Sequence, residues 1–108
     1  MTVGAVIVNM TSDQLVNETS PVTVECVIQA NPLNVVKLFT WYHVNDPDVE
    51  VLADKPEVIS WSSSMATSRL FIAHASTRNS GIYRCVAYNG LGLAVNATTS
   101  VIVLRTYF

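Results

Sequence analysis

The side chains best suited to chemistry in this chain are two cysteines, two histidines and a group of carboxylates. Cys26 and Cys85 can form a disulfide in an oxidising compartment, or they can stay buried as free thiols. His43 and His74 have no Cys, Asp or Glu partner at metal-ligand spacing. That arrangement favours surface imidazoles over a metal or catalytic site.

The carboxylates gather around one turn, at Asp46, Asp48, Glu50 and Asp54. A calcium site of the EF-hand type would need a glycine-shaped loop, which is absent, so a solvated turn is the better interpretation. The segment Asn89-Gly-Leu-Gly92 lacks the helix that binds phosphate in nucleotide sites. The sequence therefore predicts no catalytic residue, no metal, no cofactor and no small-molecule substrate, and we expect the chain not to be an enzyme.

The chain has 108 residues, of which 50% are hydrophobic, and a net charge of −2. This length fits one domain, predicted over residues 1–104, with 105–108 as the start of a linker. The six basic residues are scattered, which argues against nucleic acid and against direct membrane contact. The start lacks the basic region and cleavage site of a signal peptide, so we expect a piece of a longer protein with an expression Met1.

Three N-x-[ST] sequons, at Asn9, Asn17 and Asn96, are acceptor sites for N-glycosylation. Each match is weak alone, but three in one short chain favour passage through the secretory pathway. We therefore expect an extracellular location, within a membrane-anchored cell-surface protein.

The chain reads as short strands separated by turn residues, with no helical periodicity. The expected strands span residues 3–10, 15–16, 22–28, 36–43, 49–53, 56–61, 67–73, 81–88 and 93–104. Alternation predicts that Trp41, Tyr83 and Cys85 point inward from their strands, together with Val22, Val24, Cys26, Ile28, Phe39, Leu70, Ile72 and Ala87. Asn89-Gly90 predicts a hairpin turn.

Two further predictions concern the direction of side chains in the last strand and the position of Trp61. A glycan cannot point into a core, so a glycan on Asn96 would turn Leu93, Val95, Ala97, Val101 and Val103 inward. Trp61 is expected to pack beneath the crossover that precedes its strand, because an exposed lone tryptophan is uncommon.

The residues around the second cysteine carry a family pattern. Leu70-Phe-Ile72 and the run from Asn79 to Gly92 resemble the immunoglobulin I-set pattern L-x-I, then D-x-G-x-Y-x-C-x-A-x-N-x-x-G. The resemblance covers residues 14–104, and Asn79 replaces the pattern's aspartate. The spacing from Cys26 to Trp41 is longer than the family's usual spacing, which predicts an extended loop around residues 31–35.

The resemblance implies an all-β immunoglobulin-like sandwich of two antiparallel sheets with one disulfide between them. Cys26 and Cys85 would form that bridge and Trp41 would pack on it. Tyr83 would hydrogen-bond back across the preceding corner.

The outward face of the sheet that carries Trp41 and Cys85 is unusually apolar. We expect a protein-binding surface there, formed by Leu38, Tyr42, Ile82, Arg84, Val86 and Tyr88. A solvated face or a contact with a neighbouring domain of the same chain are the alternatives.

The resulting hypothesis is an extracellular protein–protein recognition module of a cell-adhesion, guidance or signalling receptor. Its partners would be a homophilic or heterophilic cell-surface protein and neighbouring immunoglobulin or fibronectin-type domains. The alternative is a structural spacer in an extracellular-matrix or muscle filament protein.

Overall fold

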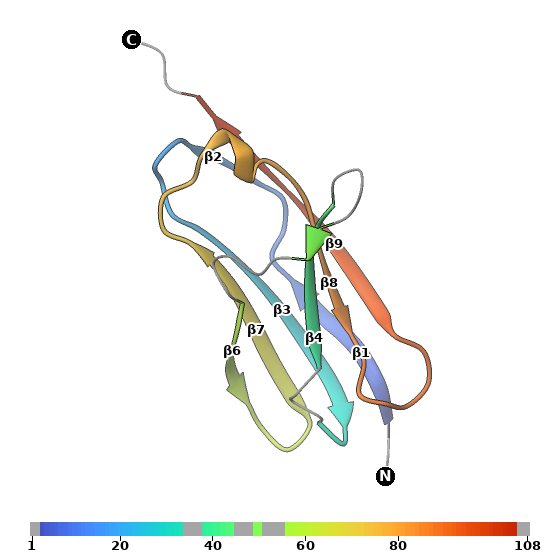
Figure 1. Ribbon diagram of the computed structural model, residues 1–108. Coiled ribbons are helices and arrows are strands. Elements are labelled where there is room, and N and C mark those ends of the chain that lie inside the picture. Colours follow the sequence, from blue (N-terminus) through green and yellow to red (C-terminus); the bar gives the residue numbers. More distant parts are fainter. Residues whose placement is uncertain (1–2, 34–37, 45–48, 51–55, 106–108) are drawn as a thin grey trace.

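The computed structural model describes residues 3–33, 38–44, 49–50 and 56–105, which fold into two stacked sheets (Figure 1). The first strand begins at one end of the sandwich, and the last strand finishes at the other end (Figure 1). The elements are β1 (Val3–Met10), β2 (Gln14–Asn17), β3 (Val22–Asn31), β4 (Phe39–Val44), β5 (Val49–Glu50), β6 (Glu57–Trp61), β7 (Met65–Ile72), the 3₁₀ turn η1 (Thr77–Asn79), β8 (Gly81–Ala87) and β9 (Val95–Leu104).

Among the described residues, one sheet has four strands in the order β1-β3-β7-β6 and the other has five in the order β2-β9-β8-β4-β5. The all-β sandwich predicted from the sequence is confirmed. One pairing departs from the antiparallel expectation, because β2 runs parallel to β9. The N-terminal segment leaves the first sheet after β1 and joins the second as β2.

Short polar side chains hold this change of sheet in place. The backbone N–H of Glu25 in β3 donates to Oγ1 of Thr11 at 2.8 Å. Two residues later, Asp13 accepts from the backbone N–H of Ser100 in β9 at 2.9 Å. Thr11 therefore ties the crossing to one sheet and Asp13 ties it to the other.

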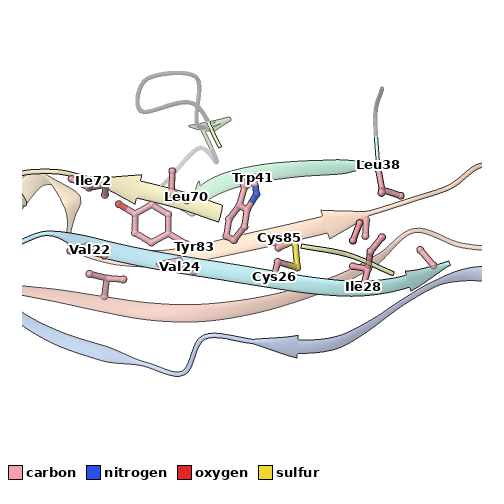
Figure 2. Close-up of a cluster of buried hydrophobic side chains, with 14 of the residues drawn as sticks. Val22, Val24, Cys26, Ile28, Leu38, Trp41, Leu70, Ile72, Tyr83 and Cys85 are labelled. Carbon is pink, nitrogen blue, oxygen red and sulfur yellow. A yellow bond between two sulfur atoms is a disulfide. The ribbon is translucent and has the colours of Figure 1, made fainter. Parts of the chain in front are cut away.

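The core lies between the sheets and is built by strict alternation along the central strands (Figure 2). In β3 every second residue from Val22 to Ala30 is buried. In β7 the buried positions are Ala66, Ser68, Leu70 and Ile72, and in β8 they are Tyr83, Cys85 and Ala87. Removal of these apolar side chains from water is the main favourable term in folding. The inward positions predicted in these three strands are confirmed.

The last strand is shorter than predicted. Val95, Ala97, Val101 and Val103 face inward, as the position of Asn96 requires, and Asn96 itself is exposed. Leu93 was predicted inward but is 87% exposed, because β9 begins only at Val95. The alternation of inward and outward side chains applies only within a strand.

The connection before β9 is a longer loop than the predicted hairpin turn, because β8 ends at Ala87. Asn89 is buried in it, and its side-chain nitrogen donates to the carbonyl oxygen of Pro32 at 3.0 Å. The side-chain oxygen of Asn89 accepts from the backbone N–H of Leu91 at 3.3 Å. The asparagine therefore ties this loop to the end of β3.

The prediction for Trp61 is wrong, because its side chain is 65% exposed. Its register partner Ala66 is buried, so the ring leaves β6 on the core side of the sheet. β6 is an edge strand with a bulge between Val58 and Ser60, and Trp61 is its last residue. A side chain at the margin of a sandwich can face the core side without being covered.

Candidate protein-binding surface

The outer face of the five-stranded sheet is positioned by contacts on its inner side. Cys26 and Cys85 form the disulfide that joins the sheets. Trp41 lies directly opposite Cys85 in the β4–β8 pair, and Cys26 lies directly opposite Ser68 in the β3–β7 pair. Figure 2 shows the indole beside the disulfide. The predicted packing of Trp41 at the bridge is therefore present.

A second link between the sheets was not foreseen in the sequence. The indole Nε1 of Trp41 donates to Oγ of Ser68 at 2.9 Å, and both residues are buried. A buried indole N–H needs a partner, since an unsatisfied buried donor is costly. The only hint in the sequence is a serine at an inward position of β7, between Ala66 and Leu70.

Tyr83 anchors the corner before β8, as the resemblance implied. Its hydroxyl donates to the carbonyl oxygen of Asn79 at 2.7 Å. The side-chain oxygen of Asn79 accepts from the backbone N–H of Ser76 at 2.7 Å. Asparagine thus supplies an acceptor at this corner without the aspartate's charge.

His43 is a packed residue rather than the surface imidazole that the sequence suggested. Its ring stacks on Tyr83, with centroids 4.5 Å apart and planes 4° apart. Its Nε2 lies 2.9 Å from the carbonyl oxygen of Ser80. Gly81 leaves room for the ring, because a Cβ there would lie 2.6 Å from that nitrogen. His74, in contrast, is exposed as expected.

With Trp41 and Cys85 inward, their neighbours Tyr42 and Arg84 must point outward, and they lie directly opposite each other. Cζ of Arg84 lies 5.3 Å from the centroid of the Tyr42 ring, within cation–π range. Val86 is half-buried on the same face, and Ile82 and Tyr88 are exposed. Strand register therefore places four of the six predicted binding residues on one face, and Tyr88 is exposed just beyond the end of β8.

Leu38 is the exception, because its side chain is 0% exposed and belongs to the core (Figure 2). The prediction extended the alternation of β4 back through Leu38, but the strand begins at Phe39. The carbonyl oxygen of Leu38 accepts from the backbone N–H of Tyr88 at 3.1 Å. Because Leu38 precedes β4, its side chain does not follow the alternation of that strand. Phe39, which was predicted inward, is half-buried.

The same face carries an apolar area that the sequence analysis missed. Leu15 and Ile102 are register partners in the β2–β9 pair and are 64% and 51% exposed. Leu104, two residues further along β9, is 44% exposed. We call these three residues the apolar end of the face. The one available signal was that Val101-Ile-Val-Leu104 is apolar on both faces of its strand.

All three sequon asparagines are exposed. Asn9 lies on β1 opposite Val27, on the four-stranded sheet. Asn96 lies opposite Val86, and Asn17 lies opposite Leu104, so two sequons are on the five-stranded sheet, toward opposite ends of β9.

Over the residues that the structure describes, no group of three or more His, Cys, Asp and Glu side chains could hold a metal ion. Of the predicted acidic group, Asp46, Asp48 and Asp54 lie outside the described residues. Within the described part of the chain, no helix has the length and apolar character to cross a membrane.

Comparison with known proteins gives a family match and similar proteins. The family model described as Immunoglobulin domain matches residues 5–103. Roundabout homolog 1 of Mus musculus is 33% identical over 107 residues, which are 94% of this chain and 6% of that protein. Cell adhesion molecule DSCAM of Gallus gallus is 29% identical over 89 residues, 82% of this chain and 4% of that protein. The chain therefore spans a small part of the length of these relatives.

Among solved structures, the titin domains z1z2 in complex with telethonin superpose with a TM-score of 0.76 at 20% identity. The match covers 99% of this chain and 50% of that one. At this identity the likeness establishes the fold alone.

Proposed function

The chain belongs to the immunoglobulin domain family, and we propose that it is an extracellular, non-catalytic module that binds a protein partner through the outer face of the five-stranded sheet. It is homologous to domains of cell-adhesion and guidance receptors. The partner is a cell-surface protein, either a second copy of the parent or a different receptor. The observation that carries the proposal is the contact between Tyr42 and Arg84, which lies among apolar side chains on the same face.

The composition of the face supports binding. Tyrosine and arginine are enriched at the residues that carry most of the energy in interfaces. Tyr42 and Arg84 are both half-buried by their neighbours, so their side chains lose less freedom when a partner covers them. Ile82 adds exposed apolar area on the same face of β8, and Tyr88 is exposed just beyond the end of that strand.

An extracellular location is supported by two independent features. The disulfide between Cys26 and Cys85 is of a kind that persists in oxidising compartments. The three exposed sequons are accessible to a glycan without any disturbance of the core.

The test is a set of variants in the ectodomain of the parent protein. Tyr42→Ala and Arg84→Glu should each weaken partner binding or self-association at least about tenfold, which corresponds to about 1.4 kcal/mol. Matched controls lie on the outer face of the other sheet, where Phe71 and Arg69 are exposed on β7. Phe71→Ala and Arg69→Glu remove the same kinds of side chain and should leave binding unchanged.

Melting temperature separates loss of binding from loss of fold in all four variants. Binding that survives both Tyr42→Ala and Arg84→Glu would assign the face to a spacer or to a domain–domain contact. The structural-spacer alternative would then be favoured. Binding that falls equally in the controls would move the partner site to the four-stranded sheet.

A further inference from the structure

We propose that an N-glycan on Asn17 lies over the apolar end of the five-stranded sheet and excludes this area from the partner surface. The inference rests on the extracellular location proposed above. It concerns three aliphatic side chains, Leu15, Ile102 and Leu104, which are 64%, 51% and 44% exposed. A contiguous exposed apolar area usually marks a surface that another group covers, because uncovered apolar areas promote association between protein molecules.

The side chain of Asn17 leaves the sheet next to these residues. β2 pairs with β9 so that Leu15 faces Ile102 and Asn17 faces Leu104. Leu15 and Asn17 are two positions apart in one strand, so their side chains lie on the same face, and both are exposed. Directly paired residues in a sheet hold their Cβ atoms about 5 Å apart. The first sugar on Asn17 therefore starts within reach of all three apolar side chains.

The backbone around this asparagine is held in place. The N–H of Glu18 donates to the carbonyl oxygen of Leu104 at 2.9 Å, which extends the β2–β9 pairing by one residue. The N–H of Ser20 donates to the carbonyl oxygen of Asn17 at 3.2 Å, and the N–H of Thr19 donates to that of Ala75 at 2.8 Å. A glycan attached here is directed by a fixed strand end rather than by a loose loop.

The other two sequons do not have this setting. Asn96 pairs with Val86 and Asn9 pairs with Val27, and both valines are already half-buried by their own neighbours. Val8, the neighbour of Asn9 in β1, is itself 46% exposed, but Asn9 lies on the four-stranded sheet, away from the β2–β9 pair that forms the apolar end. The chain thus provides two matched control sites that differ from Asn17 in what lies next to them.

Attachment forms a bond between Nδ2 of Asn17 and the anomeric carbon of the first sugar. The donor is a lipid-linked oligosaccharide of the secretory pathway: the bond between its anomeric carbon and the diphosphate oxygen breaks, the lipid diphosphate leaves, and a base of the transferring enzyme takes the proton that the amide loses. The product is a bulky, hydrated chain whose sugar rings present C–H faces to the leucine and isoleucine side chains. The polar groups of the glycan then face water in place of the aliphatic side chains.

The experiment measures side-chain accessibility in the full-length protein expressed in mammalian cells. Glycopeptide mass spectrometry gives the occupancy of each sequon, and hydroxyl-radical footprinting gives the labelling of Leu15, Ile102 and Leu104. We expect Asn17 to be occupied and Asn17→Gln to raise the labelling of these three residues about twofold, because the bulky glycan no longer covers them. Asn9→Gln and Asn96→Gln should leave that labelling unchanged, and Leu93, which is 87% exposed and lies outside the β2–β9 pair, should label equally in every variant.

A second measurement protects the test from a variant that fails to fold. The double variant Asn9→Gln with Asn96→Gln carries a glycan only on Asn17, and enzymatic removal of that glycan from the folded protein should raise the same labelling. Occupied control sequons with an empty Asn17, or labelling that ignores the loss of the Asn17 glycan, would overturn this inference and leave the extracellular proposal intact. All three sequons empty would overturn this inference and would also remove one of the two supports for the extracellular location.

Discussion

Two neighbouring residue pairs on the same two strands have opposite roles. Trp41 and Cys85 face the interior, whereas Tyr42 and Arg84, one residue along in each strand, face outward. The inner pair is tied to the opposite sheet by a disulfide and by a hydrogen bond of 2.9 Å to Ser68. The outer pair has a cation–π contact within its own sheet. The difference indicates that the inner pair links the two sheets and that the outer pair takes no part in that link, as the proposed binding surface requires.

Loss of the disulfide should have the largest effect on the inner side. Replacement of Cys26 and Cys85 by alanine should lower the free energy of unfolding by about 2–5 kcal/mol, the range typical of small secreted domains. Denaturant unfolding followed by circular dichroism measures this loss. A stability within error of the unmodified chain would mean that the bridge does not support the inner face.

Loss of the hydrogen bond between the two sheets should have the second-largest effect on the free energy of unfolding. Ser68→Ala leaves the Trp41 indole N–H buried without its partner and should cost about 1–3 kcal/mol. Thr67→Ala is the matched control, since Thr67 is the next residue of β7 and points to the outer side. Equal losses in the two variants would show that the indole finds another acceptor.

Loss of the Tyr83 hydroxyl at the corner before β8 should reduce the free energy of unfolding by a smaller amount. Tyr83→Phe removes the donor to the carbonyl oxygen of Asn79 and should cost about 1–2 kcal/mol while the stacking with His43 is retained. Tyr88→Phe is the control, because Tyr88 is an exposed tyrosine just after the same strand. Overlapping denaturation curves for Tyr83→Phe and the unmodified chain would contradict this role.

The sequence predicted the inner face well, because within one strand the direction of a single side chain fixes the direction of all the others. Once Cys26 is inward, Val22, Val24 and Ile28 must follow. Alternation does not place a residue that lies outside a regular strand or at its margin. Leu38 and Leu93 precede their strands, and Trp61 ends an edge strand after a bulge.

Features that need two distant segments to meet were not predictable from one segment. The bond from Trp41 to Ser68 depends on how the two sheets align across the core. The apolar end depends on the parallel pairing that sets Leu15 beside Ile102. Each residue alone looks ordinary in the sequence, and only the pairing gives it a role.

The smallest expected effect on the free energy of unfolding concerns the outward pair, Tyr42 and Arg84. It gives the most direct comparison with the inward pair. A double-mutant cycle with Tyr42→Ala and Arg84→Ala should give a coupling of about 0.5–1 kcal/mol in unfolding free energy, the range for exposed cation–π contacts. The same cycle for Trp41→Phe and Ser68→Ala should give a larger coupling, because a buried hydrogen bond is lost there rather than a contact that water can replace. Denaturant titration of the single and double variants measures both. An outer coupling as large as the inner one would mean that Arg84 and Tyr42 help to hold the fold, and substitutions there would no longer test binding alone.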